Sequence, residues 1–535
     1  MTGYDAVFVG SGINSLAGGA LLAKEGWRVC VLERNDWLGG AIKTVEGLTA
    51  PGFTHEAFSS WHPLWVASPA YAELKPDLDR LGLEYLNTDL PTAAAFPDGS
   101  SAFLSTDVAV NVAELGEAWQ RQFDEFMAGA EIAFGVLGTE LWSTQGLALG
   151  RRAYSHYGRR GLVEFAAHSL LSARDWLTDT FDREQARGML APWVLHTGLG
   201  PDQAMSGFMT QVIACALQLG GLPVPKGGGV KLVEGLAAII QDAGGELRTE
   251  AEVERILISD GRASGVRLAG GETIRASRAV LACVTPTQLY GRLLAEGEVP
   301  PRVREAAQHF RYGRGEMQIH IAMNELPRWQ GDERLARTPL LHLTPGLDGV
   351  SRAVNEAERG LLPAESTIAL GQPMTVDPSR APDGSWVIWV QLQELPSRPK
   401  GDAAGELDTG DGTWTEELRE AYADRIVERI GRHIANLGSA TVARVVMSPA
   451  DMEAANPNWV GGDIYAGSCS LDQNLLFRPT AATPGHETPV DRLFQIGAST
   501  HPGPGLGAGS GYLVAKYLTR PPLTRRLLAK LPGVP

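Results

Sequence analysis

Residues 4 to 44 read YDAVFVGSGINSLAGGALLAKEGWRVCVLERNDWLGGAIKT and contain the strongest structural signal in the chain. A short apolar run, Ala6 to Val9, leads directly into Gly10-Ser11-Gly12. Leucines at helical spacing follow, and a second apolar run, Val29 to Leu32, ends at Glu33. Strand, glycine turn, helix, strand and acidic residue in this order are typical of a dinucleotide-binding βαβ unit.

The chemistry of this unit depends on its glycines and on the acidic residue. The glycines let the backbone approach a pyrophosphate at a helix N-terminus, where free N–H groups and partial positive charge bind anions. Glu33 lies 23 residues after Gly10, which is suitable for accepting a hydrogen bond from an adenosine ribose 2′-hydroxyl. An acidic group there disfavours a 2′-phosphate, so we do not expect NADP. Ser15 replaces the third glycine of the usual pattern and is small enough for the helix to pack on the strand.

A second strand–glycine–helix segment lies near the other end of the chain. Leu493 to Ile496 predicts a strand, the glycine-rich residues 497 to 511 follow, and a helix is expected from Tyr512. The N-terminus of such a helix suits an electron-rich ligand edge. Taken alone, the segment is equally consistent with a loop of turn-forming residues.

The rest of the chain divides into a helix-rich part and parts of mixed character. A β meander is expected over residues 253 to 283, with turns at two glycine-containing dipeptides. Residues 76 to 224 are rich in helix formers and tryptophan, and Ser385 to Leu392 predicts a strand. We therefore expect an α/β protein in which a Rossmann-type domain is interrupted by a mixed α+β substrate-binding domain. The expected limits are 1–75, 225–300 and 485–535 for the first domain, and 76–224 and 301–484 for the second.

Composition excludes some classes of function. The chain has 535 residues and a net charge of −15, which argues against a nucleic-acid partner. No apolar run is long enough to span a membrane, and a strand expected within five residues of the start leaves no room for a targeting peptide, so a cytoplasmic location is expected. No metal site is expected, because the four cysteines are scattered and are interpreted as reduced thiols: Cys30, Cys215, Cys283 and Cys469.

The C-terminal segment, residues 520 to 535, reads RPPLTRRLLAKLPGVP and alternates basic residues with leucines. On a helix this pattern gives an apolar stripe with a cationic flank, which is typical of an interfacial membrane anchor. A short solvated terminus explains the same residues. Peripheral membrane contact through this tail and a plain solvated end both stay open.

The expected meander with Val253 and five segments together carry a resemblance to a known family: GSGINSL, VLERNDWLGG, APGFTHE, GGDIYAGSCSLDQNLLFRP and GASTHPGPG. They resemble flavin-dependent oxidoreductases of the phytoene desaturase-like superfamily, in particular its branch of carotenoid ketolases and pyridine nucleotide-disulphide oxidoreductase domain-containing proteins. The resemblance runs from end to end, although the middle matches loosely. It implies a glutathione reductase/amine oxidase-like fold with non-covalently bound FAD.

The resemblance also implies roles for single residues. Glu33 is expected at the adenosine ribose, Val253 at the adenine, and Ser59 and Ser60 near the flavin ring. Two departures are visible: Ala41 stands where arginine is common, and GLGAGSG replaces the usual GVxGASG. The residues implied for FAD binding are Gly10, Gly12, Ile13, Asn14, Ser15, Glu33, Arg34, Gly39, Gly40, Ala41, Ser59, Ser60, Val253, Gly497, Ala498, Gly505, Leu506 and Gly507.

Two residues are candidates for catalysis. His501 follows the strand of the second segment and is expected either to orient the flavin or shuttle a proton, or to bond to backbone in a turn. Asp472 is expected either to act in catalysis or to pair with Arg478 in the cavity wall. The tryptophans of residues 76 to 224, such as Trp193, are expected to line an apolar tunnel or, for most of them, to belong to the core.

The resemblance predicts an FAD-dependent dehydrogenase or oxidase that takes a hydride from a hydrophobic, isoprenoid- or polyene-like substrate. A second dinucleotide fingerprint is absent, so oxygen or a quinone is the expected electron acceptor. Three alternatives stay open: a redox-neutral isomerase that uses reduced FAD, a flavin amine oxidase, and a non-catalytic FAD-binding interaction protein.

Overall fold

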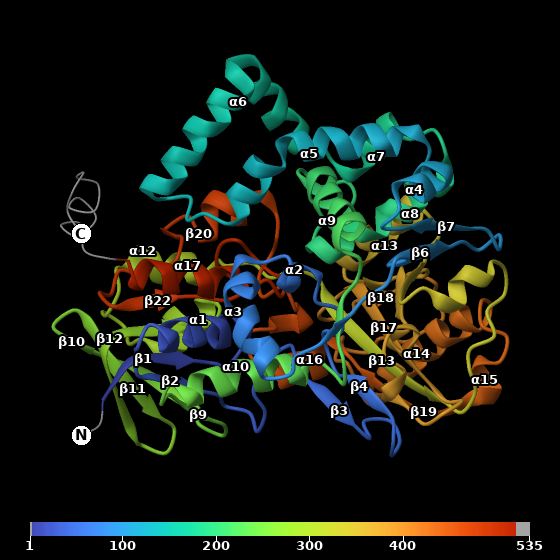
Figure 1. The fold of residues 1–535 in the computed structure, drawn as a ribbon. Coiled ribbons are helices and arrows are strands. Elements are labelled where there is room, and N and C mark those ends of the chain that lie inside the picture. Colours follow the sequence, from blue (N-terminus) through green and yellow to red (C-terminus); the bar gives the residue numbers. More distant parts are fainter. Residues whose placement is uncertain (1–2, 521–535) are drawn as a thin grey trace.

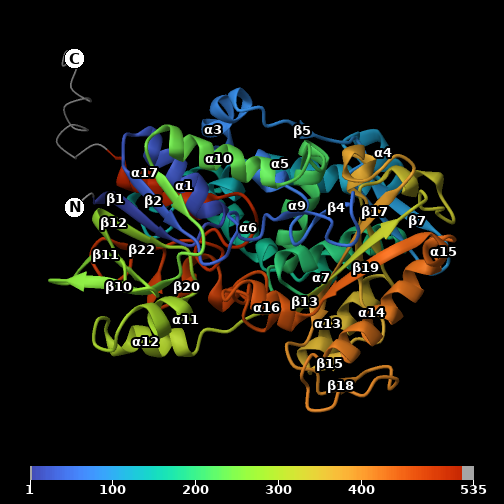
Figure 2. The ribbon, with the colours of Figure 1, turned by 90° about the horizontal axis from the view of Figure 1, so that it is seen from below.

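The computed structural model describes residues 3–520 and contains two seven-stranded sheets side by side (Figures 1 and 2). In the first sheet the order is β10–β11–β12–β1–β2–β9, and β22 also pairs with β12. Five of its strands are parallel: β9 (Glu246–Arg248), β2 (Val29–Leu32), β1 (Tyr4–Val9), β12 (Thr273–Ala282) and β22 (Leu493–Gln495). The predicted Rossmann-type domain is therefore confirmed.

Both faces of this parallel sheet are buried, which explains its continuous apolar strands. Ala6 and Phe8 of β1 pack against three helices on one face, whereas Val7 and Val9 face the meander on the other. The helices are α1 (Ile13–Lys24), α10 (Val230–Asp242) and α17 (Gly509–Leu518). The meander consists of β10 (Val253–Ser259), β11 (Arg262–Leu268) and the first half of β12, all antiparallel.

The second sheet has the order β19–β13–β17–β16–β14–β6–β7. All neighbouring pairs are antiparallel except β14 and β6. Its strands are β19 (Thr441–Met447), β13 (Gly315–Met323), β17 (Trp386–Leu395), β16 (Ile368–Gly371), β14 (Leu340–Leu343), β6 (Thr92–Ala95) and β7 (Ser101–Leu104). The long strand predicted from Ser385 is β17.

Helices cover both faces of the second sheet. One face packs on α14 (Glu416–Gly431), and the other packs on a helical layer that Figure 1 shows above the sheet. That layer contains α4 (Val108–Leu115), α5 (Glu117–Leu137), α7 (Ala173–Thr180), α8 (Glu184–Leu190), α9 (Ser206–Gly220) and α13 (Leu347–Glu358).

Further helices and short strands complete the described chain. The remaining helices are α2 (Pro63–Val66), α3 (Pro69–Arg80), α6 (Thr144–Ser169), α11 (Pro286–Gln288), α12 (Pro301–Gln308), α15 (Leu437–Ala440) and α16 (Pro449–Ala455). The remaining strands are β3 (Thr44–Glu46), β4 (Thr54–Glu56), β5 (Tyr85–Leu86), β8 (Val224–Pro225), β15 (Leu361–Leu362), β18 (Gly401–Asp402), β20 (Pro479–Thr480) and β21 (Thr483–Pro484).

The helix-rich segment differs from the expectation in two places. It contains β6 and β7, which the sequence pattern does not reveal because β6 reads TAAA and is buried on both faces without apolar–polar alternation. The expected limit at residue 75 falls inside α3, whose Leu74 and Leu78 pack in the core of the first sheet. The first unit therefore continues at least to the end of α3.

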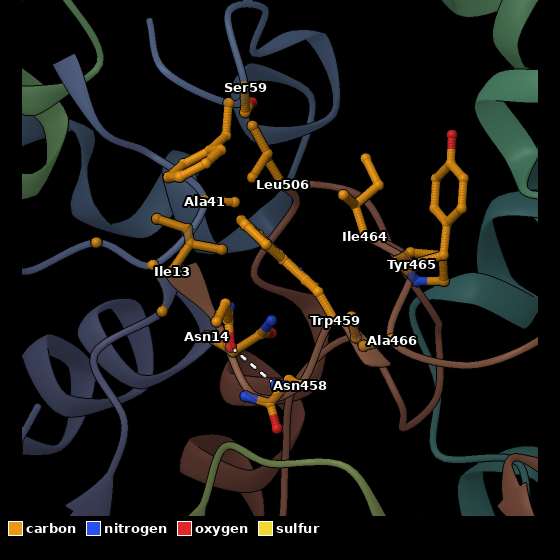
Figure 3. A pocket seen from close by; sticks show the side chains of 18 of the residues that line it. Ile13, Asn14, Ala41, Ser59, Asn458, Trp459, Ile464, Tyr465, Ala466 and Leu506 are labelled. Atoms are coloured by element: carbon orange, nitrogen blue, oxygen red, sulfur yellow. Dashed lines mark hydrogen bonds between the residues drawn. The ribbon is translucent and has the colours of Figure 1, made fainter. Parts of the chain in front are cut away.

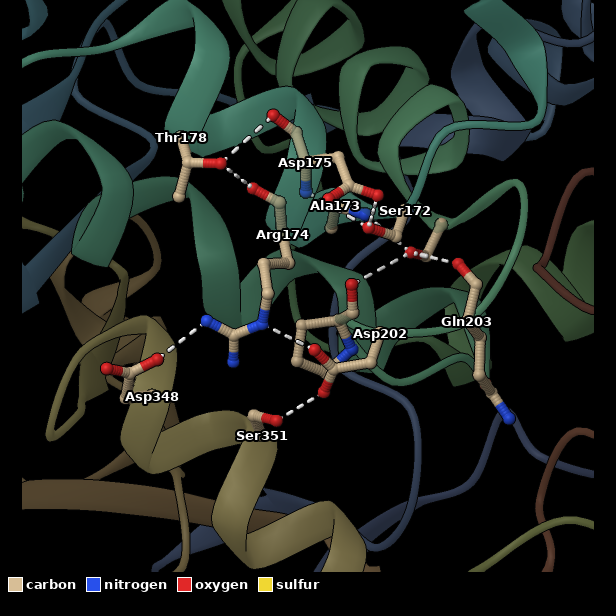
Figure 4. Close-up of polar contacts among 11 residues, drawn as sticks. Ser172, Ala173, Arg174, Asp175, Thr178, Asp202, Gln203, Asp348 and Ser351 are labelled. Carbon is tan, nitrogen blue, oxygen red and sulfur yellow. Dashed lines mark hydrogen bonds and ion pairs between the residues drawn. The ribbon is translucent and has the colours of Figure 1, made fainter. Parts of the chain in front are cut away.

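Buried and exposed arginines tie distant elements together. Arg380 donates to Glu56 of β4 and to Asp377, both at 2.6 Å, and all three side chains are almost completely buried. At the surface, Arg174 of α7 contacts Asp202 and also Asp348 of α13 (Figure 4), which ties two helices of the helical layer to each other.

Candidate active site

One cavity, about 370 Å³ in volume, extends from the first sheet to the interface between the second sheet and its helical layer. At one end it is lined by the β1–α1 turn, the end of β2 and the loop before α17. At the other end it is lined by residues of β13, β17 and α9, and by the 3₁₀ segment Ala191–Thr197. The carboxyl ends of β1, β2 and β22 thus point at the same space, as expected for a nucleotide site in an open α/β sheet.

The N-terminus of α1 offers a site for a phosphate group. No side chain caps this helix and no acidic residue lies in its first turn, so its first N–H groups remain without helical partners. Gly10 and Gly39 have φ values of +88° and +108°, which favour glycine. A Cβ atom on Gly39 would lie 2.6 Å from the carbonyl oxygen of Ile42. Glycine is therefore required by the backbone here, and the uncovered helix end fits a pyrophosphate.

Glu33 follows β2 and is held with its carboxylate at the cavity. Its Oε2 accepts hydrogen bonds from the amide and hydroxyl of Ser11 at 3.0 and 2.7 Å, and its Oε1 accepts one from the Asn35 amide at 3.0 Å. A carboxylate has about four acceptor positions, so one remains for a ribose hydroxyl. The side chain is only 7% exposed, and its orientation is fixed before any ligand binds.

The two ends of the chain meet at the phosphate end of the cavity. Gly511 of α17 donates its N–H to Oδ1 of Asn14 in α1 at 3.1 Å, across 497 residues of sequence. The backbones are so close that a Cβ atom on Gly511 would lie 1.9 Å from the Asn14 carbonyl oxygen. The loop before α17 is therefore held against the β1–α1 turn by glycine-mediated helix packing.

Most of the residues predicted to bind the cofactor line this cavity. The exceptions are Ser15 and Gly507. Ser15 is completely buried, and its N–H donates to the Gly12 carbonyl at 2.8 Å, so it shapes the turn without facing the space that a ligand would occupy. Ser15 therefore fills the packing position of the third glycine.

His501 does not line the cavity, in contrast to its predicted catalytic role. Its Nε2 bonds to the Val136 carbonyl at 2.9 Å, and its own carbonyl accepts a bond from His486 at 2.8 Å. Burial lowers the pKa of His501 to about 4. The structure supports the alternative of a neutral histidine bonded to backbone in a turn.

Asp472 also lies outside the cavity. Its side chain is 64% exposed and pairs with Arg311 at 2.5 Å, so neither the catalytic role nor the pairing with Arg478 is found. Arg478 is instead completely buried and donates to backbone carbonyls, including that of Ala498 at 2.7 Å. Sequence proximity suggested an Asp472–Arg478 pair, but a 3₁₀ turn directs Asp472 outwards to a residue 161 positions earlier.

Apart from Trp193, the far end of the cavity is lined by residues that the sequence alone did not identify. In the view of Figure 3, Ile13 and Ala41 lie on the opposite side of the cavity from Ile464 and Tyr465, and Trp459 extends between them. Further lining residues there are Trp61, Trp193, His196, Ile213, Leu217, Leu222, Trp389, Gln391 and Gln393. Trp193 thus lines the predicted tunnel, whereas Trp119 and Trp176 belong to the core and Trp142 is exposed.

Within residues 3–520, no three His, Cys, Asp or Glu side chains are grouped so as to hold a metal ion. No helix there combines the length and apolar character needed to cross a membrane. The tail predicted to contact a membrane lies, apart from Arg520, outside the described residues.

Comparison with known proteins agrees with this geometry. Residues 16–509 match the family described as flavin containing amine oxidoreductase. The chain is 26% identical to pyridine nucleotide-disulfide oxidoreductase domain-containing protein 2 of Rattus norvegicus, over 97% of this chain and 93% of that protein. It is 24% identical to the neurosporene-forming phytoene desaturase of Cereibacter sphaeroides, over 97% and 96% of the two chains.

A solved structure supports the fold. Putrescine oxidase, in a wild-type structure with bound putrescine, superposes with a TM-score of 0.60 at 17% identity, over 97% of this chain and 99% of that one. The predicted resemblance and the α/β fold class are confirmed. The chain belongs to the flavin containing amine oxidoreductase family and is a flavin-dependent oxidoreductase.

Proposed function

We propose that the protein binds FAD non-covalently and oxidises a hydrophobic, isoprenoid-like substrate. The observation that carries the proposal is a single cavity with a dinucleotide cradle at one end and a largely apolar chamber at the other. When bound, FAD supplies a hydride acceptor, so a substrate C–H bond needs only to be held next to it. The dinucleotide cradle at one end of the cavity and the apolar chamber at the other would therefore serve one reaction.

The residues of the cradle suit an adenine dinucleotide. The uncapped N-terminus of α1 would hold the pyrophosphate, and Glu33 would accept a hydrogen bond from the adenosine ribose. The loop before α17 brings Gly497 and Gly505 to the same cavity, and the helix that follows has no side-chain cap. Its positive end would face the electron-rich edge of the flavin.

The chamber favours an uncharged, apolar substrate over an amine. Trp193, Ile213, Leu217 and Leu222 supply apolar walls. The acidic residues among the lining residues are Glu33 and Glu252, and both belong to the cradle end. A cationic amine would therefore be desolvated in the chamber without a carboxylate partner, which costs several kcal/mol. The similarity to a phytoene desaturase points to an isoprenoid skeleton.

The proposal also covers the electron acceptor and the location of the protein in the cell. The described chain has one strand–glycine–helix fingerprint with an acidic residue after its second strand, so we propose oxygen or a quinone as acceptor. We propose a cytoplasmic protein whose residues 520–535 bind a membrane surface. Co-sedimentation of the full chain and of a chain ending at Thr519 with anionic vesicles tests the last point, and equal binding would contradict it.

An anaerobic experiment tests the proposed function. The FAD-loaded protein is mixed with C15 to C40 isoprenoids in the absence of oxygen, and the visible flavin spectrum is followed. Oxidation predicts bleaching of the flavin by one equivalent of substrate and recovery of the spectrum when air is admitted. An isomerase would convert substrate only when the flavin is reduced beforehand. No spectral change with any isoprenoid, and no conversion, would refute the proposal.

A further inference from the structure

One wall of the chamber is polar although it is buried. On β17, Ile388, Val390 and Leu392 pack in the core against α14, while the alternate residues Trp389, Gln391 and Gln393 line the cavity. The two glutamines are only 6% and 5% exposed. Burying an amide without full hydrogen bonding costs free energy, and an apolar residue would serve a purely apolar chamber better. These glutamines therefore indicate a polar group in the ligand.

The hydrogen bonds around Gln393 fix the direction of its amide. Tyr465 donates its only hydroxyl proton to the Leu195 carbonyl at 2.9 Å. Its oxygen must therefore accept from Gln393, whose Nε2 lies 2.8 Å away. Oε1 of Gln393 is left as an acceptor with no partner among residues 3–520.

His196, in the 3₁₀ segment Ala191–Thr197, and His342 of β14 form a pair that supplies a hydrogen-bond donor. Nε2 of His196 and Nε2 of His342 are 2.9 Å apart, so one ring donates and the other accepts. Burial lowers the pKa of His196 to about 4, and burial together with the neighbouring His196 lowers the pKa of His342 well below its ordinary value, so both rings are neutral.

The tautomers of the pair follow from the buried Nδ1 of His342, which has no partner in the described chain. A buried N–H without a partner is rarer in proteins than a buried acceptor without one, so His342 carries its proton on Nε2 and donates it. His196 then accepts at Nε2 and carries its own proton on Nδ1. His196 lines the cavity, and its Nδ1 has no partner among residues 3–520.

We propose that the isoprenoid-like substrate carries a hydroxyl group that the polar wall, defined as His196, Gln391 and Gln393, recognises. A hydroxyl accepts one hydrogen bond and donates another, which matches Nδ1–H of His196 and Oε1 of Gln393. Behind the wall, Gln391 contacts Glu316, whose burial raises its pKa well above the ordinary value. The wall therefore carries no charge and selects a neutral alcohol. This inference rests on the proposed function for the nature of the carbon skeleton.

A matched pair of ligands tests the inference by binding alone. FAD-loaded protein is titrated with farnesol and with farnesene, which share a C15 skeleton, and the change in tryptophan fluorescence and flavin spectrum gives each Kd at measured free concentration. We expect farnesol to bind about 10- to 100-fold more tightly than farnesene. Equal affinities, tighter binding of farnesene, or no binding of either ligand would overturn the inference.

Single substitutions test which side chains cause the preference for farnesol over farnesene. Gln393→Leu and His196→Phe keep approximate shape and remove one hydrogen-bonding group each, so each should reduce the preference for farnesol about 10-fold or more. Gln241→Leu, at an exposed position of α10 that does not line the cavity, is the matched control and should leave this preference unchanged. Circular dichroism and FAD content show that each variant is folded, and Gln393→Leu alone is sufficient if His196→Phe does not fold. A preference that survives both substitutions would contradict the role of the wall.

Failure of the inference and failure of the proposed function give different results. Farnesol that binds preferentially but never bleaches the flavin would leave the polar wall intact and refute oxidation of that skeleton. Farnesene that binds as tightly as farnesol and bleaches the flavin would support oxidation and overturn the selection of an alcohol.

Discussion

Replacing Gly511 by alanine tests whether the two chain ends form one cofactor cradle. Gly511 lies in the first turn of α17, and its N–H bonds to the side chain of Asn14 in α1. An added Cβ atom would lie 1.9 Å from the Asn14 carbonyl oxygen, whereas real Cβ contacts stay beyond about 3.0 Å. The helices must therefore separate by roughly 1 Å, because the atom that is struck belongs to backbone.

The displacement of the two helices is expected to lower both the free energy of unfolding and the affinity for FAD. Overpacking of a buried contact costs about 1–3 kcal/mol, and a gap of up to 1 Å removes a quarter to a half of each affected dispersion contact. The higher helix propensity of alanine returns at most about 1 kcal/mol. We expect the free energy of unfolding to fall by about 2–3 kcal/mol. Since the N-terminus of α1 and the loop before α17 line the cavity, FAD affinity should fall about 10- to 100-fold, which corresponds to about 1.4–2.8 kcal/mol.

The assay is a fluorescence titration of the apoprotein with FAD, together with a thermal melt. Gly431→Ala is the matched control, because Gly431 ends α14 and an added Cβ atom there meets no other atom within 4 Å. This control should keep the wild-type Kd and should be as stable as the wild type or slightly more stable. Wild-type FAD affinity and melting temperature in Gly511→Ala would refute the argument that α1 and α17 jointly build the cradle.

Three further predictions concern charge. Arg380→Met should lower the free energy of unfolding by about 3–5 kcal/mol, because Glu56 and Asp377 stay buried without their cation. The control is Arg160→Met at an exposed ion pair, which should cost less than about 1 kcal/mol in urea melts. Similar losses in the two variants would contradict the argument. Asp472→Asn should leave the rate of flavin reduction in stopped-flow mixing unchanged, since the Asp472 side chain is mostly exposed. A tenfold lower rate would contradict this prediction and support a catalytic role. The melting temperature should fall as pH drops from 6.5 towards 4.5, because several histidines bind protons in the unfolded chain but stay neutral in the folded one. Each of these histidines reduces the free energy of unfolding by up to about 1.4 kcal/mol per pH unit. A melting temperature that does not change over this range would contradict the prediction. The groups are the buried histidines with pKa values of about 3 or 4: His55, His62, His196, His320 and His501.

The sequence predicts best what is encoded locally. The β1–α1–β2 unit and the position of Glu33 directly after β2 are specified by adjacent residues whose spacing follows from strand and helix geometry, and both are found as predicted. The helix after the second glycine segment begins at Gly509, three residues before the expected start, because its first turn consists of glycine and serine. Strands β6 and β7 are not predicted because each has only four residues, which are mostly or wholly buried and show no apolar–polar alternation.

Features that depend on contacts between distant residues were not predictable from one sequence. Gly511 meets Asn14 and His196 meets His342 only after folding, and neither pair has a spacing that marks it beforehand. Asp472 is a candidate because it belongs to a polar set in an otherwise apolar segment, and His501 because it follows the second glycine-rich strand end. Backbone turns direct the first to the surface and the second to a carbonyl. The glutamines of β17 became informative only when both faces of the strand proved to be buried.

The central claim is that both chain ends build one cradle for non-covalent FAD, and the flavin released from purified protein tests it most directly. The protein is denatured by heat, precipitated, and the supernatant is analysed by mass spectrometry and absorbance. We predict about one unmodified FAD per chain for the wild type, and strongly reduced FAD for Glu33→Ala, which removes the ribose acceptor. No flavin in the wild type after reconstitution, flavin that stays with the precipitate, or full occupancy in Glu33→Ala would contradict the account.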